Sequence, residues 1–173
     1  MGRSKKSTEI VIMNDRQQFD SIVRDVLKHE GGYVHDPKDL GGETKYGISK
    51  RWYPNVDIKN LSVDDAVVIY YNDYWKPSKA ERLPEEIRAT YFDMVVNMGQ
   101  KRAVKILQQC INSKSLRKID EDGLIGKQTI QHASKVKKQR LQAYRCLYYA
   151  GIVQDKPEQE RFYYGWYKRA ISV

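Results

Sequence analysis

Two carboxylate residues that flank a glycine-rich segment are the residues of this sequence whose types and spacing best suit chemistry. Glu30 is followed directly by two glycines, and Asp39 and Thr44 come soon after them. A loop with glycine hinges could fold Asp39 and the Thr44 hydroxyl group back beside Glu30. Two carboxylates across a cleft are the minimum that the cleavage of a glycosidic bond requires. The segment therefore indicates glycosidic-bond chemistry.

A helix that ends at Glu30 is expected to position the first carboxylate. Its apolar stripe recurs at helical spacing over residues 19–27, and Asn14, Asp15 or another nearby polar residue could cap its start. The glycines after Glu30 suit a left-handed helix end. That end of the helix dipole is negative, and this position, partial burial and the nearby Asp39 would each favour the protonated acid that a general acid must supply. A solvated residue at a helix end is the alternative interpretation of Glu30 taken alone.

The rest of the sequence predicts helices and few strands, so the fold class is mainly α. Residues 48–53 are expected to form a short helix or a turn. A helix opens at Ser62, with Asp65 as a capping-box partner, and continues to Trp75. A nearly all-apolar helix from Pro84 to Gly99 is expected to lie at the centre of the domain.

The second half of the chain predicts further helices. One covers residues 101–111, and one long basic helix is expected from Lys127 to Tyr148. Between them, the acidic residues of segment 120–126 lack the spacing of a calcium loop and are better explained by a turn. The C-terminal segment 161–169 is aromatic and cationic. Most of its rings are expected to pack into a core, although such rings also suit sugars and bases.

Two polar residues interrupt the central apolar helix. Asp93 and Asn97 are four positions apart and so lie on one helix face. Buried polar groups must be hydrogen-bonded. The pair could hold the Glu30 loop from beneath or line the floor of a cleft; equally, it could cap a neighbouring helix or bind a buried water.

Length, charge and cysteine content bound the class of protein. The chain has 173 residues, a net charge of +9 and a pI near 9.4, which fits one domain with or without a small helical appendix and indicates a polyanionic partner. The basic start lacks the apolar core of a signal peptide, and no apolar run approaches the ~20 residues that span a bilayer. Synthesis in the cytoplasm without stable membrane insertion is therefore expected. Cys110 and Cys146 lack metal-ligand spacing and are expected to be free thiols rather than a disulfide.

Taken in order, these motifs resemble glycoside hydrolase family 108, the N-acetylmuramidase-type lysozymes of phages and of secretion-associated bacterial operons. The resemblance begins near Phe19 and covers most of the chain. Its N-terminal motifs are Glu30-Gly31-Gly32-Tyr33, Asp36-Pro37, Asp39 to Ile48, Tyr74-Trp75, Phe92-Asp93, Asn97, Gly99 and Leu107-Gln108. Its C-terminal motifs are similar to the small peptidoglycan-binding region of that family, and they are Asp122 to Thr129, Arg145, Tyr148-Tyr149 and Phe162 to Arg169.

The resemblance implies a lysozyme-like helical catalytic domain over residues 14–104. It also implies a small helical peptidoglycan-binding region over residues 105–173, packed against that domain. The implied substrate is the glycan of bacterial peptidoglycan, cleaved between N-acetylmuramic acid and N-acetylglucosamine. No metal or organic cofactor is implied.

The same resemblance assigns roles to single residues. Glu30 is implied to be the catalytic acid. The spacing of Glu30, Asp39 and Thr44 is similar to the Glu/Asp/Thr triad of phage-type lysozymes, with one residue fewer before Thr44. Asp39 would stabilise positive charge or act as a base on a water that Thr44 orients. Candidate contacts with the sugar are Tyr33, Tyr46, Asn97 and Gln100.

Two other functional classes remain open at this point. One is a non-catalytic wall-binding or secretion-accessory protein with the same fold, which the joint presence of Glu30, Asp39 and Thr44 disfavours. The other is a basic nucleic-acid binder, which only the charge supports, because no zinc-finger, RNP or basic-zipper signature is present. An enzyme without a signal peptide would reach the periplasm and the cell wall through a holin or another exit pathway.

Overall fold

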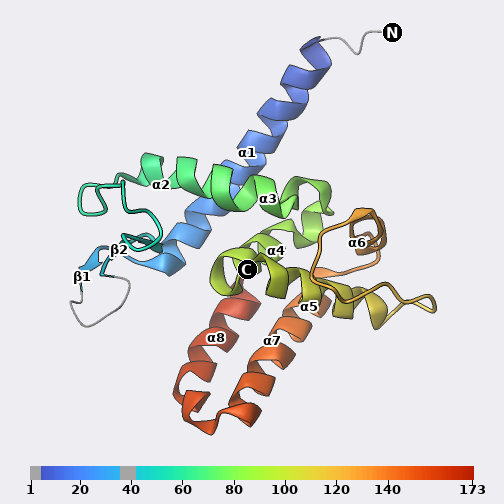
Figure 1. Ribbon diagram of the computed structural model, residues 1–173. Coiled ribbons are helices and arrows are strands. Elements are labelled where there is room, and N and C mark those ends of the chain that lie inside the picture. Colours follow the sequence, from blue (N-terminus) through green and yellow to red (C-terminus); the bar gives the residue numbers. More distant parts are fainter. Residues whose placement is uncertain (1–4, 36–41) are drawn as a thin grey trace. The chain divides into compact units, whose positions relative to one another are not determined.

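The computed structural model describes residues 5–35 and 42–173, and the side chains from Asp15 onward within these ranges. Over this part of the chain the structure is mainly helical with one small antiparallel sheet (Figure 1), which confirms the expected fold class. The chain divides into two compact units, Met1–Asp73 and Tyr74–Val173. The predicted Asp39 lies outside the described residues.

The first unit begins with α1 (Lys5–Glu30), which ends at the residue that the sequence predicts. The expected start at Asn14 or Asp15 is wrong. No proline or glycine occurs between Lys5 and Glu30. The helix can therefore continue toward the N-terminus beyond its apolar stripe. Gly31 follows in a left-handed conformation with φ of +78°, as the predicted helix end requires.

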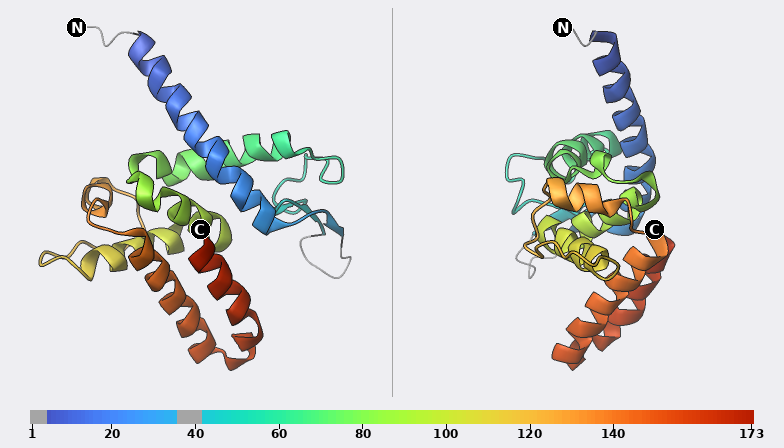
Figure 2. Two further views of the ribbon diagram at one scale, coloured as in Figure 1. Left: turned by 180° about the vertical axis from the view of Figure 1, so that it is seen from behind. Right: turned by 90° about the vertical axis from the view of Figure 1, so that its right-hand side faces the viewer.

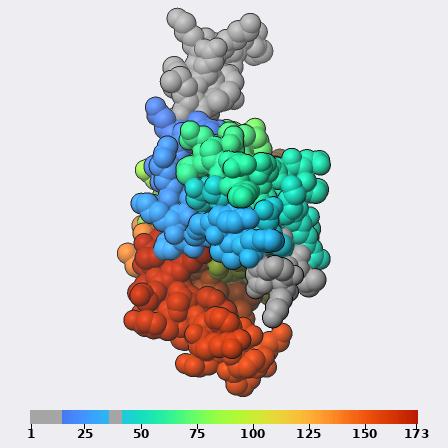
Figure 3. Space-filling view, turned by 90° about the vertical axis from the view of Figure 1, so that its left-hand side faces the viewer, coloured from blue at the N-terminus to red at the C-terminus, as the bar shows by residue number. Residues whose placement is uncertain are grey.

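A small sheet follows α1, in the strand order β1-β2-β3. Its strands are β1 (Val34–His35), β2 (Glu43–Lys45) and β3 (Ile48–Ser49), and both pairings are antiparallel. Residues 48–53 therefore begin as a strand and only then turn, because Ile48 pairs with Lys45 and is fully buried. The C-terminal part of α1 and this strand region form one continuous surface (Figure 3).

The helix predicted at Ser62 is confirmed as α2 (Val63–Tyr70). The Ser62 side chain accepts a hydrogen bond from the Asp65 N–H group, and the Asp65 carboxylate accepts one from the Ser62 N–H group, so the capping box is complete. A π-helix (Tyr71–Trp75) and α3 (Lys76–Ser78) follow without a break. The predicted helix is thus present as far as Trp75, but its winding changes after Tyr70.

The second unit is built around α4 (Glu85–Met98), the central helix that the sequence predicts. A 3₁₀-helix (Ala80–Arg82) comes before it, and α5 (Gln100–Asn112) comes after it. Gly99, with φ of +82°, separates α4 from α5, as expected. Both helices are largely buried, and α4 buries Ile87, Tyr91, Phe92, Met94 and Val95.

The prediction of one long basic helix after Lys127 is wrong. The structure has α6 (Lys127–Ala133) and α7 (Lys138–Asp155), with a non-helical link between them. Val136 in that link is buried, so the chain turns there to place its side chain in the core. The turn predicted over residues 120–126 is confirmed, because the Asp122 carboxylate accepts hydrogen bonds from the Leu124 N–H group and from Gln108.

The chain ends with a 3₁₀-helix (Pro157–Gln159) and α8 (Glu160–Ser172), which lies beside α7 in all views (Figures 1 and 2). The expectation that most aromatic rings of this segment are buried is wrong. Tyr164 is 70% exposed, and Ala170 is the residue of α8 that is buried. Phe162 and Trp166 stack on each other and Trp166 on Tyr149, so the rings cover one another at the surface. Cys110 and Cys146 are free thiols, as predicted.

Candidate functional site

The Glu30 carboxyl group lies against a tight turn between β2 and β3. Glu30 is half-buried at the last position of α1. Gly47 of the turn has a φ of +72°. A methyl group at Gly47 would lie 2.8 Å from Glu30 Oε2 and 3.3 Å from Glu30 Cγ. The carboxyl group therefore occupies the space that any side chain at position 47 would need.

The turn itself consists of Tyr46 and Gly47, and both residues have positive φ, 52° and 72°. Two such residues between paired antiparallel strands match a type I′ hairpin turn. The buried Tyr70 hydroxyl group, at the end of α2, donates a hydrogen bond of 2.9 Å to the Tyr46 carbonyl oxygen. That hydroxyl group would also lie 2.7 Å from a methyl group at Gly47. Elements α1, α2 and the hairpin therefore meet at one point, beside Glu30.

Two further predicted residues of this unit, Thr44 and Tyr33, lie in or next to the same sheet. Thr44 is half-buried in the middle of β2, opposite Val34 and Ser49. Tyr33 is partly exposed just before β1 and donates a hydrogen bond of 2.8 Å to the Glu43 carboxylate. That hydrogen bond raises the pKa of the Tyr33 phenol above its ordinary value. Tyr46, a third predicted residue, belongs to the turn that lies against Glu30.

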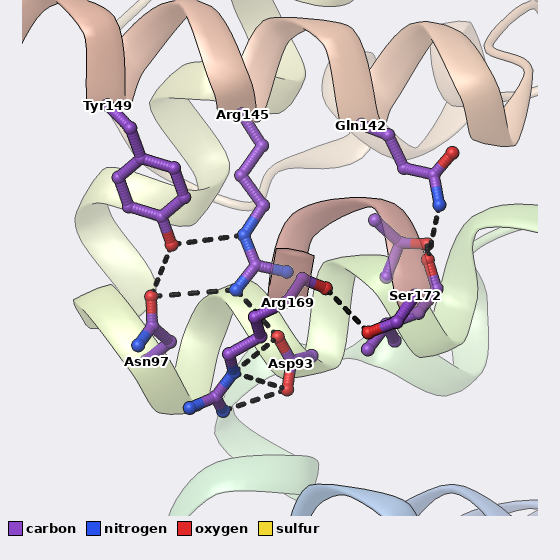
Figure 4. A network of polar contacts seen from close by, with 9 residues as sticks. Asp93, Asn97, Gln142, Arg145, Tyr149, Arg169 and Ser172 are labelled. Carbon is purple, nitrogen blue, oxygen red and sulfur yellow. Dashed lines mark hydrogen bonds and ion pairs between the residues drawn. The ribbon is translucent and has the colours of Figure 1, made fainter. Parts of the chain in front are cut away.

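Asp93 and Asn97 belong to a polar network inside the second unit (Figure 4). The Asp93 carboxylate is fully buried and accepts from the guanidinium groups of Arg145 on α7, at 2.6 Å, and Arg169 on α8, at 2.8 Å. The Asn97 side-chain oxygen accepts hydrogen bonds from the Tyr149 hydroxyl group and from Arg145. Asp93 thus pairs with two arginines, a partner type that none of the interpretations from the sequence includes. The network fastens α7 and α8 to the central helix.

Gln100, the last predicted contact residue, lies at the start of α5 beside a hollow of about 440 Å³. Its side-chain amide donates to the Pro77 carbonyl oxygen at 3.1 Å. The hollow is lined by three cations of one helical turn and is called the basic hollow below; its cations are Lys101, Arg102 and Lys105. All three are exposed, and within the described residues none of them has an acidic partner. Arg102 lies over the ring of Tyr148.

Neither a metal site nor a membrane span is found in the part of the chain that the structure describes. No group of three or more histidine, cysteine, aspartate or glutamate residues could hold a metal ion there. None of the helices described is long and apolar enough to cross a bilayer.

Sequence reasoning missed three residues that the structure makes important. Tyr70 was expected only as part of an apolar helix face, and nothing in its spacing indicates a hydrogen bond to a distant turn. Arg145 and Arg169 received no role, although an aspartate within an apolar helix was a signal, since a buried carboxylate needs cationic or hydrogen-bonding partners.

Comparisons with known proteins find two families that match successive segments of the chain. Residues 23–99 match the family described as glycosyl hydrolase 108, and residues 102–171 match a predicted peptidoglycan domain. Eleven chains of solved structures are similar to this chain. One is the structure of Brucella abortus SagA, with 28% sequence identity and a TM-score of 0.70 over 89% of this chain and 90% of that chain. No curated protein matches the chain.

These findings confirm the lysozyme-like, mainly α fold and the family that the motifs resemble. They support a relation to peptidoglycan-related glycosidases, with peptidoglycan as the indicated partner of the C-terminal region. The part of the chain from residue 23 to residue 99 is thus similar to the glycosyl hydrolase 108 family.

Proposed function

We propose that this protein is a peptidoglycan hydrolase, an N-acetylmuramidase that uses Glu30 as its general acid. The observation that carries the proposal is the position of the Glu30 carboxyl group, at the C-terminal end of α1 and against Gly47, the residue of the turn that has no side chain. The match of residues 23–99 to a glycosyl hydrolase family supplies the reaction class.

In the proposed reaction, Glu30 protonates the glycosidic oxygen between N-acetylmuramic acid and N-acetylglucosamine. The departing sugar leaves an oxocarbenium-like centre. Asp39 either stabilises the positive charge of this centre or deprotonates a water molecule that attacks it. Thr44 orients that water. Thr44 is the middle residue of β2 and lies two positions before Tyr46, where the turn begins. This position is compatible with the role.

The second unit is proposed to hold the protein on the wall. The match of its residues 102–171 to a predicted peptidoglycan domain supports this role. The basic hollow offers positive charge to the carboxylates of the peptidoglycan stem peptides. Tyr33 and Tyr46 are proposed as sugar contacts in the first unit, and Asn97 and Gln100 in the second. The protein is proposed to be made in the cytoplasm and to reach the wall through a holin or another exit pathway.

Mass analysis of the new reducing ends on digested peptidoglycan tests the proposed reaction. An N-acetylmuramidase leaves N-acetylmuramic acid at the new reducing end. New ends that carry N-acetylglucosamine would refute the proposed bond. Binding to peptidoglycan without any new end would instead favour the non-catalytic wall-binding class.

A further inference from the structure

Tyr70 combines deep burial with a hydrogen bond to a segment far away in the sequence. It is the last residue of α2 and is 1% exposed. Its hydroxyl group donates to the Tyr46 carbonyl oxygen at 2.9 Å, across a sequence separation of 24 residues. A buried hydroxyl group requires such a partner, and its ring holds it in place among the core residues of the first unit. The hydrogen bond therefore fixes the hairpin turn to α2.

The turn that Tyr70 holds is in a conformation that needs support. Tyr46 has φ of 52°, a left-handed backbone conformation that residues other than glycine rarely adopt. Such a conformation persists where the surrounding structure determines it, and it gathers at functional sites. Here the surrounding structure consists of the β2–β3 pairing on one side and the Tyr70 hydroxyl group on the other.

The same turn borders the Glu30 carboxyl group. The Tyr70 hydroxyl group and Glu30 Oε2 would lie 2.7 Å and 2.8 Å from one methyl group at Gly47. Both oxygens thus face the same small space above the Gly47 backbone. A shift of the turn toward or away from α2 would change the room that is left for the carboxyl group.

We propose that Tyr70 is a positioning residue for Glu30. Its hydroxyl group fixes the Tyr46–Gly47 turn, and the turn fixes the side-chain orientation of Glu30 relative to the glycosidic oxygen. This inference rests on the proposed function of Glu30 as the general acid. Misplacement of a reacting group by about 1 Å costs about 100-fold in rate, so the hydrogen bond has a measurable consequence for the chemical step.

The variant Tyr70→Phe keeps the ring and removes the hydroxyl group. We expect kcat on soluble peptidoglycan fragments to fall by about 10- to 100-fold, because the turn that orients the Glu30 carboxyl group is no longer fixed. Tyr71→Phe is the matched control. The Tyr71 hydroxyl group donates to Asp15 at 3.1 Å, and Asp15 lies about 22 Å from Glu30 along α1.

A second measurement does not depend on activity. Glutamate side chains labelled with ¹³C at the carboxyl carbon report their surroundings by NMR, and Glu30→Gln assigns the Glu30 signal by its loss. The Glu30 signal should move in Tyr70→Phe and stay in place in Tyr71→Phe, with both variants folded by circular dichroism.

The outcomes separate the two proposals. A wild-type protein that cuts no peptidoglycan would refute the proposed function, while the NMR comparison would still decide whether Tyr70 orients Glu30. Equal kcat values for Tyr70→Phe and Tyr71→Phe, or a Glu30 signal that is unmoved in Tyr70→Phe, would overturn the inference.

Discussion

Replacement of Gly47 by alanine should disable the Glu30 site without unfolding the protein. The new methyl group would lie 2.7 Å from the Tyr70 hydroxyl group and 2.8 Å from Glu30 Oε2. Both distances are shorter than the non-bonded contacts that Cβ atoms make in proteins. Either the carboxyl group or the turn must therefore move. Since the carboxyl group is the end of a flexible side chain, we expect it to yield first and to leave its present orientation.

The cost of this substitution has two parts. Gly47 has φ of +72°, and an L-residue in this left-handed conformation costs roughly 1–2 kcal/mol. Crowding in a packed site adds about 1–3 kcal/mol, less what the movement of the carboxyl group relieves. We expect a loss of about 2–4 kcal/mol in the free energy of unfolding and a fall of about 100-fold in kcat, because the displaced acid no longer meets the glycosidic oxygen.

Two other glycines separate these parts. Gly42 has φ of +65° but would place a methyl group in open space, so Gly42→Ala reports the backbone strain alone. Gly32 has neither a positive φ nor a neighbour within 4 Å, so Gly32→Ala should be close to wild type. Urea denaturation gives the free energy of unfolding, and release of reducing ends from peptidoglycan gives the rate. If Gly47→Ala matches Gly42→Ala in both assays, the contact between the turn and Glu30 does not matter and the reasoning is refuted.

Three further predictions concern other parts of the chain. Asp93→Asn should cost about 3–5 kcal/mol in the free energy of unfolding by urea denaturation, because it leaves Arg145 and Arg169 without their buried counter-charge; a loss below about 1 kcal/mol would contradict this. Asp39→Asn should reduce lysis less than loss of the acid if Asp39 only stabilises charge, and nearly as much if it is the base; an unchanged lysis rate would remove Asp39 from the site. Alanine at the three cations of the basic hollow should weaken peptidoglycan binding about tenfold in pull-down assays at low salt and less above ~0.15 M salt. The charge-matched control replaces Lys114, Arg117 and Lys135 by alanine. Equal weakening of peptidoglycan binding in this control would show that only the net charge matters.

The local features of the fold could be predicted from the sequence where one short segment determines them. The end of α1 at Glu30 follows from two glycines, and the start of α2 follows from the Ser62 and Asp65 capping box. Gly99 likewise separates α4 from α5. Each of these signals lies within a few residues of the feature that it predicts.

Features that depend on distant contacts could not be predicted in this way. The break between α6 and α7 exists because Val136 enters the core, while the residues around it have ordinary helix propensity. The aromatic residues of α8 look like a core stripe, but Phe162 and Trp166 cover each other at the surface. In both cases the tertiary contacts determine the local structure and the burial, and the sequence pattern alone does not reveal these contacts.

The residues of the candidate site also differ in whether local sequence signals identify them. Glu30 was identifiable because its helix end and the glycines after it are local. The contribution of Tyr70 was not, because it acts through a hydrogen bond to Tyr46, which lies far from it in the sequence. Asp93 was recognised as an anomaly within an apolar helix, but its partners Arg145 and Arg169 come from two other helices.

The measurement that tests the central claim most directly is the rate of peptidoglycan cleavage by Glu30→Gln. This change keeps the shape of the side chain and removes the acid, so the rate should fall by 100-fold or more, given the usual contribution of a general acid. Circular dichroism and the midpoint of thermal unfolding should match the wild type, which shows that the fold is intact. A folded Glu30→Gln variant that cuts peptidoglycan at the wild-type rate would contradict the account, because Glu30 would then not be the acid.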